Sequence, residues 1–142
     1  MEQTKTSFSL QAVYLKDLSF ESPIARMTSI ELHGLKFDAE FETQVTNQDE
    51  KIYEVCLSLT GKGVTEKDET IYLVEVTQAG TFLRSGELEE ELIKKTTLAD
   101  CPTVLFPYLR ETVDTILLKG GWPPVTLAPI DFVSSYSAAL DS

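Results

Sequence analysis

The stretch LKFDAEFETQV, Leu35 to Val45, alternates between apolar and polar side chains. Every second side chain of a β-strand points to the same face of its sheet. One face of this strand is apolar and comprises Leu35, Phe37, Ala39, Phe41 and Val45. The opposite face is polar and comprises Lys36, Asp38, Glu40, Glu42 and Gln44. The pattern predicts a half-buried strand with one face open to water.

Three further segments share this period of two: residues 8–21, 51–63 and 70–80. In the first of them we expect the even-numbered apolar side chains to point inward: Phe8, Leu10, Ala12, Tyr14, Leu18 and Phe20. Asp17 and Glu21 would then point outward, and Lys16, Val13 and Leu15 fit the pattern poorly. Short polar links between successive strands predict a four-stranded antiparallel meander with an acidic wet face.

Helical periodicity replaces the strand pattern after Gly86. Residues 87–99 predict one helix, and Asp100 is expected to cap a second helix that carries Pro102 in its first turn. Pro107 predicts a kink or a restart near Phe106. WPPVTLAP is expected to be extended, and residues 131–140 predict a last short helix. The fold class is therefore α+β, with helices packed on one face of the sheet.

Length and charge limit the classes of function. A chain of 142 residues fits one domain, residues 1–142. The net charge of -11 disfavours nucleic acid and anionic membrane as partners and favours a basic protein segment, although acidity also serves solubility alone. The N-terminus resembles no export signal, and no segment approaches the ~20 apolar residues of a spanning helix. We therefore expect a cytoplasmic protein that does not insert into membranes.

Enzymatic chemistry has little support in the sequence. His33 is the sole histidine, and we expect it in a surface loop. Cys56 and Cys101 are expected to be reduced thiols that pack as small apolar groups. The glycine pairs lack the context of a phosphate-binding loop, and no metal-binding spacing is present. We expect no catalytic residues, no metal and no cofactor.

Four motifs occur in an order that resembles the SecB family of bacterial protein-export chaperones. They are YLKDLSFESP at 14–23, YLVEVTQAGTF at 72–82, CPTVLFPYLRETV at 101–113 and GGWPPVTLAPIDF at 120–132. The segment IARMTSIELHGLK, between Pro23 and Phe37, departs from the family's usual crossover region, and the end YSAALDS lacks the family's long acidic tail. The resemblance implies a homotetramer, a dimer of dimers in which helices lie between two eight-stranded sheets.

The resemblance also implies an ATP-independent holdase that binds unfolded preproteins and delivers them to the SecA motor. Acids matching Asp17, Glu21 and Glu75, together with Leu73, would dock the motor's basic, zinc-containing C-terminal segment. The zinc would belong to the motor. Clients would bind in an apolar groove, for which the candidate residues are Phe20, Phe82, Trp122, Leu127, Phe132 and Tyr136. Packing in the core is the alternative role of each groove candidate.

Three other functions stay open at this point. The first is a dedicated chaperone for an antitoxin of a toxin–antitoxin system, a role of divergent family members. The second is a small acyl-thioester hydrolase, which would need a pocketed carboxylate with a raised pKa. The third is an acidic decoy that mimics nucleic acid and binds a DNA-processing protein.

Overall fold

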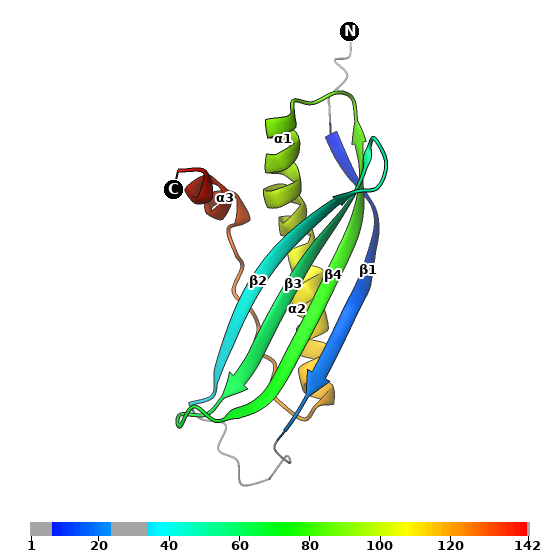
Figure 1. Ribbon diagram of the computed structural model, residues 1–142. Helices are drawn as coiled ribbons and strands as arrows, with labels where there is room; N and C mark the ends of the chain where they lie inside the picture. Colours follow the sequence, from blue (N-terminus) through cyan, green and yellow to red (C-terminus); the bar gives the residue numbers. More distant parts are fainter. Residues whose placement is uncertain (1–6, 24–33, 142) are drawn as a thin grey trace.

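Four antiparallel strands and a long helical segment form the protein (Figure 1). The computed structural model describes residues 7–23 and 34–141, so the expected loop position of His33 lies outside the described residues. The elements are β1 (Ser7–Glu21), β2 (Lys36–Asn47), β3 (Ile52–Val64), β4 (Thr70–Ser85), α1 (Glu90–Lys95), the π-helical η1 (Thr96–Asp100), α2 (Cys101–Lys119) and α3 (Phe132–Leu140). All four predicted strands are confirmed.

The strand order is β1-β4-β3-β2, which corrects one part of the meander prediction. β2, β3 and β4 do follow one another as a meander, but β1 pairs with β4 and not with β2. The links at residues 48–51 and 65–69 are short and allow only neighbouring antiparallel strands. The 14 residues between β1 and β2, residues 22–35, are enough to span the width of the sheet. β1 can therefore pair with β4, at the edge of the sheet opposite to β2.

β1 contains two bulges that change which of its side chains point inward. One extra residue, Gln11, lies between the pairs formed by Leu10 and Ala12, and a second, Lys16, lies between those formed by Leu15 and Asp17. Between the bulges the alternation is reversed. Val13 and Leu15 therefore lie opposite inward-facing β4 residues, while Tyr14 lies opposite Ala79 on the other face. Ala12, opposite Thr81, lies on that other face as well, so the predicted inward positions of Ala12 and Tyr14 are both wrong.

The two reversals cancel beyond Lys16. Leu18 pairs with Val76 and Phe20 with Val74, both of which point into the core. Asp17, opposite Thr77, points to the other face, as the simple alternation predicted. The same is true of Glu21.

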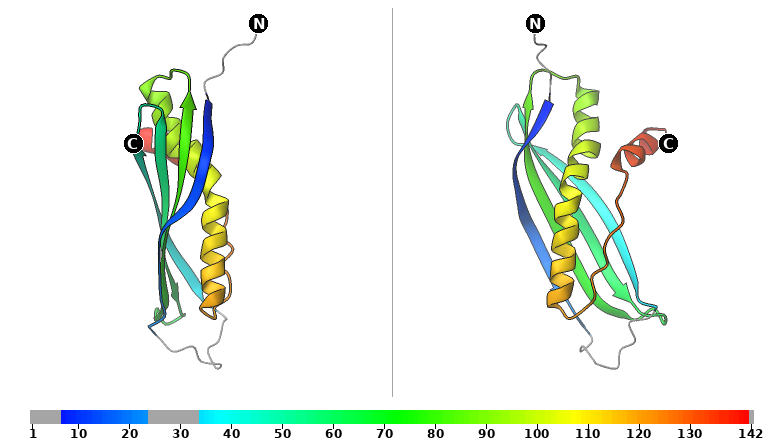
Figure 2. Two further views of the ribbon diagram at one scale, coloured as in Figure 1. Left: turned by 90° about the vertical axis from the view of Figure 1, so that its right-hand side faces the viewer. Right: turned by 180° about the vertical axis from the view of Figure 1, so that it is seen from behind.

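The core lies between one face of the sheet and α2, which covers β3 and β4 (Figure 2). The sheet contributes Val55, Leu57, Leu59, Tyr72, Val74, Val76 and Phe82. The helix contributes Leu105, Phe106, Leu109, Val113 and Leu117. Burial of this apolar area is the main source of stability. No helix of residues 7–23 and 34–141 covers the opposite side of the sheet, which we call the open face.

The helical segment is continuous from α1 through η1 into α2. Asp100 has helical backbone angles (φ -70°, ψ -41°) and makes no capping hydrogen bond, so the predicted N-cap is wrong. Thr97 and Ala99 are buried, and their packing holds the chain on the helical path through η1. α2 also continues through Pro107 without a restart. Pro107 and Thr103, whose carbonyl loses its partner, are both exposed, so water can bind that carbonyl.

The last helix, α3, begins and ends as predicted. The Asp131 carboxylate accepts a hydrogen bond from the Ser134 backbone N–H at 3.0 Å, which is the geometry of an N-cap. That bond, with a second from the Ser134 hydroxyl, holds the pKa of Asp131 below its usual value. Before α3, an extended arm at residues 122–131 runs alongside α2 (Figure 2). The prediction of an extended WPPVTLAP segment is confirmed.

Candidate functional site

The four residues expected to bind the motor segment lie together on the open face. Glu21 is opposite Leu73, Ser19 is opposite Glu75, and Asp17 lies one step further along β1. Directly opposite residues of paired strands share a face and are close neighbours. All four side chains are exposed, and 39% of Leu73 is accessible. We call Asp17, Glu21, Leu73 and Glu75 the acidic surface.

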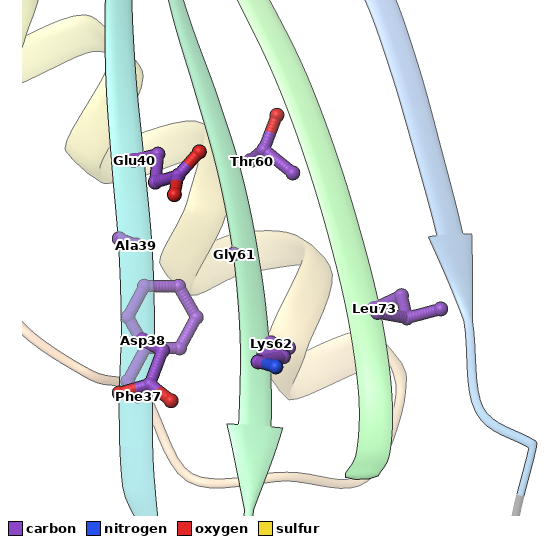
Figure 3. Close-up of a pocket in the computed structure, with 8 residues that line it drawn as sticks. All are labelled: Phe37, Asp38, Ala39, Glu40, Thr60, Gly61, Lys62 and Leu73. Atoms are coloured by element: carbon purple, nitrogen blue, oxygen red, sulfur yellow. The ribbon is translucent and has the colours of Figure 1, made fainter.

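Two shallow pockets flank Leu73 on this side of the sheet. The smaller, about 280 Å³, is lined by Ser19, Glu21, Thr60, Gly61, Leu73 and Glu75. The larger, about 750 Å³, reaches β2 and is lined by Phe37, Asp38, Ala39, Glu40, Thr60, Gly61, Lys62 and Leu73 (Figure 3). Leu73 therefore offers an apolar contact between two acid-lined depressions, which suits a basic segment that carries an apolar side chain.

Carboxylates on β2 extend the negative charge across the sheet. Asp38, Glu40 and Glu42 are exposed on the open face and lie opposite Lys62, Thr60 and Ser58 of β3. Within the described part of the chain, no carboxylate of the acidic surface has an ion-pair partner. Alternation in LKFDAEFETQV had placed these β2 acids on the wet face, but no motif had identified them as part of a site.

A second group of polar residues, which we call the Glu54 cluster, lies on the open face next to β1. Glu54 is only 6% exposed. It accepts a short hydrogen bond from the Tyr14 hydroxyl and an ion-paired hydrogen bond from Lys16 Nζ at 2.5 Å. The Cys56 thiol donates to the same carboxylate at 3.6 Å. The cluster was not predicted from the sequence, because simple alternation along β1 places Tyr14 in the core.

The contacts within the Glu54 cluster shift the pKa values of its members. Hydrogen bonds from Lys16 and then Tyr14 hold the pKa of Glu54 below its usual value. Burial, followed by the hydrogen bond to Glu54, raises the pKa of Tyr14 to about 12. Burial likewise raises the pKa of Cys56, so this thiol is a poor nucleophile. Cys56 and Cys101 are both free and buried, as predicted.

The low pKa of Glu54 predicts a specific loss of stability in acid. A carboxyl whose pKa is lower in the folded chain stabilises it at neutral pH, and this contribution is lost as the pH falls through the folded value. Below about pH 4.3, the free energy of unfolding should therefore fall more steeply for the wild type than for Glu54→Gln. Urea unfolding between pH 2 and pH 7 measures this. Glu42→Gln, which removes an exposed carboxylate, should keep the wild-type slope; equal slopes for wild type and Glu54→Gln would contradict the assignment.

Four of the six groove candidates, Phe20, Phe82, Trp122 and Phe132, pack in or against the core of the chain. Phe82 and Trp122 are only 2% and 1% exposed. Trp122 contacts the Tyr72 ring, with ring centroids 5.6 Å apart, and half-buried Phe20 stacks on Tyr72 at 6.1 Å. Phe20, Phe82 and Trp122 line none of the pockets described here and have the core-packing role that the sequence left open.

Leu127 and Tyr136 are half-buried on the helix side of the sheet, whereas Phe132 is only 8% exposed and packs edge-on against Phe106, with ring centroids 6.1 Å apart. Phe132 and Tyr136 line a pocket of about 300 Å³ together with Phe41, Thr43, Leu98, Ile130 and Ser135. A second pocket, about 340 Å³, lies beneath the arm and is lined by Leu35, Lys36, Phe37, Tyr72, Pro123, Pro124 and Val125. Leu127 is half-buried on the arm between the segments that line these two pockets. The arm and β2 therefore carry a discontinuous, largely apolar groove.

The described residues contain neither a buried carboxylate with a raised pKa nor a cluster of side chains that could hold a metal ion. Among the described residues, Glu54 is the single buried carboxylate; its pKa is lowered and not raised, and it lines none of the pockets above. Residues 7–23 and 34–141 contain no group of three or more histidine, cysteine or carboxylate side chains that could hold a metal ion. No helix in this part of the chain is long and apolar enough to cross a membrane.

Comparison with known proteins identifies the family. The family described as "Preprotein translocase subunit SecB" matches residues 1–142. The protein-export protein SecB of Aromatoleum aromaticum is 37% identical over 92% of this chain and 82% of its own length. That of Nitrosococcus oceani is 41% identical over 94% and 81%. A SecB-like chaperone of Mycobacterium tuberculosis, solved with a ChAD peptide from an antitoxin, superposes with a TM-score of 0.75 at 20% identity, covering 87% of this chain and 90% of its own. The chain belongs to the SecB family.

Proposed function

We propose that this chain is an ATP-independent chaperone of protein export, which holds unfolded preproteins in the cytoplasm and delivers them to the SecA motor. The names of its relatives support the export role. The observation that carries the proposal is the separation of an exposed acidic surface on the open face from apolar pockets on the helix side. Separate surfaces allow one protein to hold a client and the motor at the same time.

The acidic surface is the proposed docking site for the basic C-terminal segment of SecA. Charge complementarity supports this choice, since Asp17, Glu21 and Glu75 lie close together without cationic partners in the described residues. Leu73 would add an apolar contact at the centre. The zinc ion belongs to the motor segment and not to this chain.

The groove along the arm is the proposed client site. Phe132, Tyr136 and Leu127 offer apolar contacts that require no particular client sequence or register. Several weak contacts along one unfolded chain increase the overall affinity. Phe20, Phe82 and Trp122 would support these walls from within the core.

A homotetramer, built as a dimer of dimers, is the proposed assembly. Large apolar side chains are exposed on the helix side of β1 and on the outer surface of α2: Leu10, Leu15, Leu18, Val104, Tyr108 and Leu118. Apolar surface of this kind is typical of subunit interfaces. Light scattering at micromolar concentration should give four times the 15.8 kDa mass of one chain, and a strict monomer would contradict the proposal.

A holdase assay tests the function. A slowly refolding client diluted from denaturant should aggregate less in the presence of this protein without ATP, as measured by turbidity. Tyr136→Ala should weaken this protection because it removes a wall of the groove, while Ser137→Ala, at an exposed neighbouring position, should retain it. Equal aggregation with and without the protein would contradict the proposed function.

The proposal favours export over a dedicated antitoxin role. The neighbour solved with an antitoxin peptide is only 20% identical, so that likeness supports the fold alone. Relatives at 37% and 41% identity carry the protein-export name. Binding of SecA together with several unrelated preproteins would agree with the export role, whereas strict selectivity for one antitoxin would contradict it.

A further inference from the structure

The Glu54 cluster is placed where it can control the geometry of β1. Tyr14 and Lys16 both bind the buried Glu54 carboxylate, and Lys16 is the extra residue of the second bulge in β1. Glu54 belongs to β3, so these bonds pass over β4. Ala79, opposite Tyr14, has a small, fully buried side chain that leaves room for the tyrosine to cross.

The bulge at Lys16 decides where the residues after it point. Leu15 lies opposite Gln78 on the helix side. Without an extra residue, strict alternation from Leu15 would turn Asp17 and Glu21 to the helix side and Leu18 to the open face. With the bulge, both carboxylates lie on the open face, and a one-residue slip would remove half of the acidic surface.

β1 lies at one edge of the four-stranded sheet that a single chain forms. Within the described residues it pairs with β4 alone. An edge strand is less strongly held in register than a central one, and register errors invert every side chain. A buried carboxylate that is bound by Tyr14, just before the bulge, and by Lys16, within it, resists a slip, since a slip would leave that charge without its partners.

We propose that Glu54 is a positioning residue that fixes the register of β1 through Tyr14 and Lys16, and thereby keeps Asp17 and Glu21 on the acidic surface. The role of the acidic surface rests on the proposed function, but the register of β1 can be measured without any partner. Glu54 itself, being buried, need not touch the motor segment.

The test compares Glu54→Ala with Glu54→Gln in the full chain. Both remove the charge, but only glutamine keeps an oxygen that can accept from Tyr14 and Lys16. Register is measured by cross-strand NOEs between Asp17 and Thr77, with the Ser9 to Leu83 pair as an internal control before both bulges. Affinity for the zinc-loaded SecA C-terminal segment is measured by calorimetry. Glu91→Ala removes an equal charge from an exposed position of α1, outside both the Glu54 cluster and the open face.

Glu54→Ala should lose the Asp17 to Thr77 NOE and bind the segment about tenfold more weakly, while Glu54→Gln keeps the NOE and most of the affinity. Should Glu54→Ala unfold, the double variant Tyr14→Phe with Lys16→Met takes its place, with the same expected loss. An intact NOE in a folded variant would overturn the inference, as would an equal loss of affinity in Glu91→Ala. If Glu54→Ala loses the NOE but the wild-type protein does not bind the segment, the docking role of the acidic surface is refuted. The positioning role of Glu54 then still stands.

Discussion

Reversing the charge of Glu75 is expected to weaken binding of the SecA C-terminal segment by about tenfold or more, because the new lysine would lie beside Leu73 and repel a basic partner. Glu75 is exposed, opposite Ser19 of β1, and its replacement should not disturb the core. Client holding should therefore persist. Calorimetry with the zinc-loaded segment measures the first effect, and the turbidity assay measures the second.

Glu91→Lys provides the matched control for this charge reversal. Glu91 is exposed on α1, on the other side of the sheet, and the change in net charge is identical. Its effect should be small, particularly at physiological salt, where screening acts over about 8 Å. Wild-type affinity for Glu75→Lys would rule out the acidic surface, and equal losses for both variants would indicate only a general effect of net charge.

Truncation of Leu105 to alanine should lower the free energy of unfolding by about 2–5 kcal/mol. Leu105 is fully buried and fills the space above Gly80, where a Cβ atom would lie only 2.8 Å from its Cδ2. Trp122, the sole tryptophan, is itself buried and reports unfolding in urea by fluorescence. Protein concentration must be held fixed, since assembly contributes to apparent stability.

Leu73→Ala provides the matched control for this cavity. It removes the same atoms from a side chain that is 39% exposed on the open face, so the free energy of unfolding should change by about 0.5 kcal/mol or less. The same variant should weaken binding of the motor segment. If Leu105→Ala lowers the free energy of unfolding by no more than Leu73→Ala does, α2 does not pack on β4 as described.

Local patterns in the sequence were sufficient to predict the elements that bury one face. LKFDAEFETQV alternates at every position except Thr43 and falls almost entirely within β2, and Asp131 with Ser134 defines the start of α3. In each case neighbouring residues alone determine the structure, through side-chain period or a local hydrogen bond. Such features need no knowledge of what lies opposite in the fold.

Features that depend on distant residues could not be predicted in the same way. The pairing of β1 with β4 depends on a long link, and the bulges at Gln11 and Lys16 depend on contacts across the sheet. Lys16 interrupted the apolar pattern, yet its partner Glu54 lies 38 residues away in sequence. Asp100 followed by Pro102 is a sequence typical of a helix start. The packing of Thr97 and Ala99 nevertheless keeps the chain helical before Asp100.

The candidate site was predictable only in part. The alternation placed Asp17, Glu21 and Glu75 on the wet face, where they are, and their role in binding the motor stays a prediction. Among the aromatic groove candidates, the sequence could not separate Trp122, which is buried against Tyr72, from Tyr136, which lines a pocket. Core and groove residues have the same chemistry, so only the packing distinguishes them.

Simultaneous binding tests the division between the two sides of the sheet most directly. Affinity for the zinc-loaded SecA C-terminal segment is measured by calorimetry on the free protein and on protein saturated with an unfolded client. If the open face binds the motor segment and the helix side binds the client, the two affinities should agree within about twofold, because neither ligand occupies the other's contacts. Mutual exclusion of the segment and the client would contradict the account.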